Sequence, residues 1–76
     1  MKVRFYGMPL EENIGMYLRK KGISLKTLSN STNLNYACLY HSFYDSKSKR
    51  ELRGTELLKV CKFLEKDPYE FLDKEE

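Results

Sequence analysis

The sequence predicts an all-α fold, a compact bundle of five short helices that follows a short extended arm. Apolar residues recur every three or four positions over most of the chain, as they do on one face of a helix. Residue types that start or stop helices separate these stretches. A length of 76 residues is enough for one small core. It excludes a multi-domain enzyme and a doubly wound sheet with crossover helices.

The predicted domain covers residues 10–72, between an N-terminal arm at 1–9 and an acidic tail at 73–76. In an extended arm, Val3 and Phe5 would share one face, so the arm reads as a strand-like segment. A frayed terminus is the alternative interpretation.

The first helix is expected over residues 10–21, where Leu10, Ile14 and Leu18 form one apolar stripe. Acidic residues occupy its first turn and basic residues its last turn, as the helix dipole favours. Gly22 follows as a C-terminal stop.

The second helix is expected to begin after Ser24, a good N-cap, and to run from Leu25 to Ser31 or Thr32. Asn33 then tolerates the left-handed backbone conformation that a tight turn requires.

The third helix is expected over residues 36–43, capped by Asn35 and anchored inward by Leu39 and Phe43. Its other face collects Tyr36, Ala37, Tyr40 and His41, which are aromatic or polar but uncharged at neutral pH. For the series Tyr36, Tyr40 and Tyr44, we expect Tyr44 to pack against the bundle and the first two to be exposed.

A polar, basic connection follows at residues 44–53, long enough in so small a domain to suggest a function. The fourth helix is expected over residues 54–65. Asp67 and Glu70 form a capping box around Pro68, which predicts a fifth helix. The predicted core consists of Ile14, Leu18, Ile23, Leu28, Leu34, Leu39, Phe43, Leu52, Leu57, Leu58, Cys61, Leu64, Phe71 and Leu72.

The net charge of +3 is unevenly distributed. Residues 1–62 carry twelve Lys or Arg against five Asp or Glu, and residues 63–76 carry two against six. A basic body with an acidic end fits a polyanionic partner, although an ordinary solvated surface is about equally consistent with it. No signal peptide or membrane span is visible, which predicts a cytoplasmic protein.

Cys38 and Cys61 are too few for a disulfide scaffold and are interpreted as small apolar residues. Cys38 and His41 lie three residues apart, but two potential ligands do not make a metal site. The same pair lacks a third group to orient it for nucleophilic catalysis. We therefore expect no metal, no cofactor and no enzymatic activity.

Two short helices joined by a very short turn suggest a helix-turn-helix, whose second helix enters the major groove of DNA in the DNA-binding version. The sequence resembles the phage lambda-repressor and Cro-like (Xre-type) helix-turn-helix family. The resemblance covers residues 10–72 and rests on the order and spacing of Leu18, Lys21-Gly22-Ile23-Ser24, Leu28-Ser29, Thr32-Asn33-Leu34-Asn35, Leu39, Leu57 to Leu64 and Asp67 to Leu72.

The resemblance implies a set of DNA contacts. The position that binds phosphate in the family is Leu25 here, and leucine has no hydrogen-bonding group. The base-contacting residues it implies are Tyr36, Ala37 and His41, with the cap Asn35, and we add Tyr40 from the same face. The phosphate-contacting residues it implies are Lys47, Lys49 and Arg50, and we add Ser24 and Lys26 at the start of the second helix. The base-contacting set contains no Arg or Gln, the usual bidentate partners of guanine and adenine, so we expect modest specificity.

These features predict a DNA-binding transcriptional regulator, of the repressor type found in phages or mobile elements, that inserts residues 36–43 in the major groove of double-stranded DNA as a homodimer. No membrane and no small-molecule substrate is expected. The alternative hypothesis is a helix-turn-helix reused to bind protein, as in an antirepressor, antitoxin or phage-encoded inhibitor, because tyrosine is enriched at protein interfaces.

Overall fold

The computed structural model describes residues 10–45, 47 and 50–72, and the expected arm and acidic tail lie outside these residues. The elements are α1 (Leu10–Lys21), α2 (Leu25–Thr32), α3 (Tyr36–Phe43), α4 (Gly54–Leu64) and the 3-10 turn η1 (Pro68–Phe71). The described part contains no strand, so the all-α prediction is confirmed. No helix among the described residues is long and apolar enough to cross a membrane.

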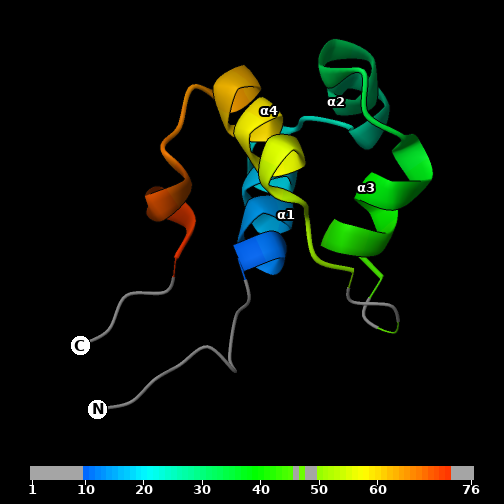
Figure 1. Ribbon diagram of the computed structural model, residues 1–76, viewed down its shortest axis with the longest axis horizontal. Coiled ribbons are helices and arrows are strands. Elements are labelled where there is room, and N and C mark those ends of the chain that lie inside the picture. Colours follow the sequence, from blue (N-terminus) through cyan, green and yellow to red (C-terminus); the bar gives the residue numbers. More distant parts are fainter. Residues whose placement is uncertain (1–9, 46, 48–49, 73–76) are drawn as a thin grey trace.

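The five elements surround the core, and each packs against two others. Helix α1 packs against α3, α3 against α2, α2 against α4, α4 against η1, and η1 against α1. Figure 1 shows α2 and α3 on one side of the molecule and η1 on the other. The core therefore lies inside a ring of short elements, and each element buries only its inward face.

The helix boundaries follow the capping residues. The side-chain oxygens of Ser24 and Asn35 accept hydrogen bonds from the third amide of α2 and of α3, respectively. Gly22 and Asn33 adopt left-handed conformations at the ends of α1 and α2, as expected. Helix α4 ends at Leu64, one residue earlier than predicted, because Glu65 turns left-handed as its C-cap.

The predicted fifth helix is only the single 3-10 turn η1. The capping box of Asp67 and Glu70 forms as expected, with Pro68 in the first turn. The backbone is extended again at Leu72, and within η1 only Phe71 is buried. The burial of one side chain stabilises too little to offset the conformational entropy lost in ordering further turns of helix.

Most of the predicted core is buried or partly buried, but Leu58 and Leu72 are 62% and 50% exposed. Leu58 points outward because Leu57, Val60, Cys61 and Leu64 form the inward stripe of α4. Leu72 is exposed because η1 ends before it. The prediction also omitted Leu25 and Val60, both of which are buried.

Helices α1 and α3 approach closely at Gly15. A Cβ atom at this position would lie 2.9 Å from a ring carbon of Tyr44 and 3.1 Å from the carbonyl oxygen of Phe43. The Tyr44 hydroxyl donates a 3.0 Å hydrogen bond to the Gly15 carbonyl, and the Arg19 guanidinium lies 4.1 Å from the centre of the Tyr44 ring. Tyr44 thus packs against the bundle, as predicted, and burial raises the pKa of its hydroxyl.

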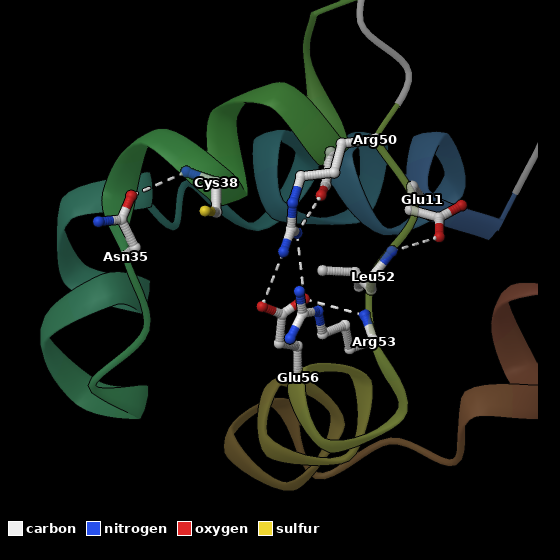
Figure 2. Close-up of polar contacts among 8 residues, drawn as sticks. Glu11, Asn35, Cys38, Arg50, Leu52, Arg53 and Glu56 are labelled. Carbon is white, nitrogen blue, oxygen red and sulfur yellow. Dashed lines mark hydrogen bonds and ion pairs between the residues drawn. The ribbon is translucent and has the colours of Figure 1, made fainter.

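A polar brace links the end of α3 to the start of α4 (Figure 2). Arg50 donates two hydrogen bonds to the Glu56 carboxylate, at 3.1 and 3.0 Å, and one to the Ser42 hydroxyl at 3.1 Å. Glu56 also accepts a bond from the Arg53 amide at the N-terminus of α4. Nearby, the Leu52 amide donates to Glu11 of α1.

The brace shifts the titration of both partners. The hydrogen bonds from Arg50 hold the pKa of Glu56 below its ordinary value, and the bond to Glu56 raises the pKa of Arg50. A lowered carboxyl pKa in the folded state stabilises the fold above the ordinary carboxyl pKa. This contribution is lost as the pH falls through the lowered value.

Leu28→Ala should reduce the free energy of unfolding by about 2–5 kcal/mol, because it truncates a fully buried side chain of α2. Urea unfolding followed by circular dichroism measures the loss. Leu58→Ala is the matched control on the exposed side of α4 and should change stability by less than about 0.5 kcal/mol. Equal losses for the two variants would contradict the assignment of the core.

Glu56→Gln should destabilise the protein at neutral pH by about 1–3 kcal/mol, because Arg50 loses its charged partner. The free energies of unfolding of the two proteins should begin to converge as the pH falls below 4.5, the ordinary pKa of the carboxyl, and should meet once the pH has passed the lowered pKa of folded Glu56, where the wild-type carboxyl is neutral as well. Urea titrations at several pH values measure this. Glu51→Gln, which removes a charge from an exposed neighbour, is the control, and a constant difference between wild type and Glu56→Gln at all pH values would contradict the ionic role.

Candidate nucleic-acid interface

The turn between α2 and α3 is fixed by its own side chains. Asn33 adopts φ 61° and ψ 32°, and its amide donates a 2.8 Å bond to the Ser29 carbonyl. The Ser29 hydroxyl reaches across the turn and donates a 2.6 Å bond to the Leu34 carbonyl. Because these bonds join the end of α2 to the residue before the cap of α3, they set the angle at which α3 leaves the turn.

Helix α3 divides into two faces. Leu39, Ser42 and Phe43 are buried against the bundle. Tyr36, Ala37, Tyr40 and His41 lie on the opposite side and form what we call the outward face. The structure thus brings together four of the five predicted base-contacting residues.

The outward face is accessible and contains no Lys, Arg, Asp or Glu. The exposed fraction is 52% for Tyr36 and 43% for Tyr40, and the His41 side chain is 45% exposed. An aromatic surface of this kind can donate and accept hydrogen bonds through its polar ends while its rings make apolar contacts.

Asn35, the fifth predicted base-contacting residue, stands at the start of this face. Its side-chain oxygen accepts a 3.0 Å bond from the Cys38 amide, and its amide nitrogen points away from the helix (Figure 2). The cap therefore uses one end of the side chain and leaves the amino group exposed as a hydrogen-bond donor.

His41 has a partner that the sequence analysis missed. Its Nδ1 lies 2.7 Å from the Oδ2 of Asp45, four residues on, and the ring of Tyr40 packs edge-on against it at 5.6 Å between centroids. The spacing of four residues was the available signal, because residues i and i+4 are neighbours on a helix.

Two of the predicted phosphate-contacting residues, Ser24 and Lys26, lie at the start of α2. The Ser24 hydroxyl accepts from the Thr27 amide at 3.1 Å and donates to the Thr27 hydroxyl at 3.0 Å, so it is engaged in capping. Lys26 is exposed. Leu25, which lies between them, is 7% exposed and belongs to the core. The apolar residue at this position therefore serves packing.

The predicted phosphate contacts on the basic connection after α3 also differ in whether they are exposed or bound to other residues. Lys47 is exposed, and its amide donates to Asp45 Oδ1 at 2.9 Å. Lys49 lies outside the described residues. Arg50 is committed to the brace with Glu56, and contact between its guanidinium and a phosphate would compete with that bond. Glu56 was missed by the sequence analysis, although its place three residues after Arg53 is the spacing of a capping box.

The described residues include no group of three or more His, Cys, Asp or Glu side chains that could hold a metal ion. Both cysteines are free thiols; Cys61 is buried and Cys38 is partly buried. Burial raises the pKa of the Cys61 thiol, which keeps it in its less reactive protonated form.

Comparison with known proteins adds one finding. The family model of the Cro/C1-type helix-turn-helix DNA-binding domain matches residues 13–75. No curated protein and no solved structure matches the chain. The match spans α2, the turn and α3 in full and continues through α4 and η1. It covers most of the chain and agrees with the all-helical fold, and the protein therefore belongs to the family of Cro/C1-type helix-turn-helix DNA-binding domains.

Proposed function

We propose that this protein is a transcriptional repressor of the phage or mobile-element type, and that it inserts α3 into the major groove of its operator. The observation that carries the proposal is the outward face of α3, presented by a rigid turn in a chain of a DNA-binding family. An α-helix fits the major groove, where each base pair displays a distinct pattern of donors and acceptors.

The base contacts in this proposal come from Asn35 and the outward face. The exposed amino group of Asn35 donates to acceptors on the base edges, and the hydroxyls of Tyr36 and Tyr40 donate or accept. The Ala37 methyl and the tyrosine rings provide apolar contact for thymine methyl groups. Without an Arg or Gln, specificity rests on single hydrogen bonds and on the shape of the DNA.

The phosphate contacts flank α3 on both sides. Before it, Ser24, Lys26 and the first amides of α2 face one backbone segment, since a helix N-terminus attracts anions. After it, Lys47 and Lys49 supply positive charge. We assign Arg50 a supporting role, because its guanidinium is bound to Glu56 at the start of α4.

A homodimer is part of the proposal, because repressors of this kind bind two half-sites about one helical turn apart, roughly 34–36 Å. Met16 and Leu72, each about half exposed, line a groove between α1 and η1. This groove and residues 1–9 are the candidate dimer surfaces.

One observation favours a second function, the binding of a protein. The sequence of α3 contains no Lys or Arg, and its two exposed tyrosines resemble the anchors of protein interfaces. The two functions differ in their dependence on salt, because phosphate contacts release counterions.

The deciding experiment titrates the protein into a labelled random-sequence duplex and follows fluorescence anisotropy at about 50 and about 200 mM salt. Binding that weakens by orders of magnitude between the two concentrations supports the repressor and justifies selecting its operator. No binding at the lower concentration rejects the repressor in favour of the protein-binding module.

Replacing Lys47 and Lys49 together by Ala should weaken binding to every duplex and should flatten the slope of log K against log salt by about 2. Both lysines contact phosphate in this proposal, and phosphate carries no sequence information. Anisotropy titrations at four salt concentrations measure the slope. The matched control, Lys59→Ala with Lys62→Ala, removes the same charge from exposed positions of α4. An equal change of slope in both double variants would exclude a specific role for the connection.

Tyr36→Ala should weaken binding to the selected operator by about 1–3 kcal/mol and leave binding to random DNA nearly unchanged, because Tyr36 contacts bases in this proposal. Competition titrations with both duplexes give the ratio of the affinities for operator and random DNA. Tyr69→Ala is the control, since Tyr69 is a highly exposed tyrosine on η1. Equal losses on the two duplexes would show that Tyr36 does not contribute to sequence recognition.

A further inference from the structure

The ring of His41 is held by a carboxylate that is itself held in place. Asp45 Oδ2 lies 2.7 Å from His41 Nδ1, and Asp45 Oδ1 accepts a 2.9 Å bond from the Lys47 amide. The Asp45 amide donates to the Tyr40 carbonyl at 3.1 Å. The carboxylate is therefore fixed at both oxygens, and its backbone is bonded to α3.

This geometry determines where the proton of a neutral His41 resides. An ionised carboxylate can only accept hydrogen bonds, so Nδ1 must be the protonated nitrogen. The other ring nitrogen, Nε2, then carries a lone pair and is an acceptor in the neutral ring. When the ring takes up a second proton, Nε2 becomes a donor while the bond to Asp45 persists.

We propose that Asp45 is a positioning residue for base recognition: it holds neutral His41 with its proton on Nδ1, so that Nε2 accepts from an exocyclic amino group of adenine or cytosine. Protonation of His41 turns the same atom into a donor, which favours guanine because its major-groove edge presents two acceptors, N7 and O6. The proposal rests on the insertion of α3 into the major groove. It makes His41 a specificity-determining residue whose preferred base changes with pH.

The surroundings of His41 are consistent with this role. Among the described residues, the titratable or charged ones that the contacts connect to His41 are Asp45, Tyr40, Lys47, whose amide donates to Asp45, and Arg50, whose amide donates to the His41 carbonyl. The side chain is 45% exposed on the outward face, whereas that of Asp45 is 20% exposed. The histidine can thus reach a base edge while the carboxylate stays behind it.

The first test needs no DNA. The chain contains one histidine, so the long-range nitrogen–proton NMR spectrum of the ¹⁵N-labelled protein shows a single imidazole. At about pH 8, where an ordinary histidine is neutral, we expect the Nδ1 shift of a protonated nitrogen and the Nε2 shift of an unprotonated one. The opposite pattern, or averaged shifts from two tautomers, overturns the proposal.

The second test asks whether base preference follows protonation. Operators are selected from a random duplex library at about pH 8 and about pH 5.5, on either side of the usual titration range of histidine. We expect one position of each half-site to change from adenine or cytosine to guanine. For single-base variants at that position, the ratio of affinities should change about fivefold or more, the discrimination typical of one base pair.

Variants test whether the pH-dependent base preference comes from His41 and its bond to Asp45. His41→Gln cannot be protonated in this range and should give the same preference at both pH values. Asp45→Ala should lose discrimination at that position, whereas Glu51→Ala, which removes a charge from the same connection, should keep it. Circular dichroism confirms that each variant is folded, and the NMR test on the unmutated protein does not depend on any variant.

The outcomes distinguish this proposal from the proposed function. DNA binding with the expected tautomer but without a pH-dependent position overturns the role of His41 and leaves the repressor intact. If the protein binds no duplex at either pH, the repressor itself fails, and the role of His41 in base recognition fails with it.

Discussion

The bond between Arg50 and Glu56 is the interaction on which the arrangement of the interface depends. Helices α3 and α4 are consecutive in the chain but do not pack directly against each other. Arg50 spans the gap between them, with Ser42 on α3 and Glu56 on α4 as its partners. A planar guanidinium paired with a carboxylate through two hydrogen bonds fixes direction as well as distance. The angle of α3 is thus set at one end by the turn of Ser29 and Asn33 and at the other by this pair.

Helix α3 has only eight residues, which must both anchor the helix in the core and present side chains to solvent. Leu39 and Phe43 bury one face, and Gly15 on α1 lets the helix approach closely because any larger residue would meet Tyr44 and Phe43. The opposite face is left without structural duties except at its ends, where Asn35 caps the helix and His41 is bound by Asp45. Residues available for recognition are therefore those that the fold does not need.

The division between structural and recognition roles also explains why the basic connection is not uniform. Its cations look equivalent in the sequence, yet Arg50 is bound to Glu56 and Lys47 is exposed. Arginine suits this partly buried position, because its delocalised charge is less strongly hydrated than that of lysine and its donors match a carboxylate. In so small a protein, a cation of the connection such as Arg50 stabilises the fold instead of remaining available to a partner.

The sequence by itself determined the positions of α1 to α4, the caps Ser24 and Asn35 and the outward face of α3, because caps and helical periodicity are local properties. It also determined most of the core. Only the tertiary structure decided that η1 is a single turn, that Leu58 and Leu72 are exposed while Leu25 and Val60 are buried, and that Arg50 has an acidic partner. These outcomes depend on which elements meet in space. The partner of Arg50 lies across a connection between two helices, and no spacing rule of one helix predicts that meeting.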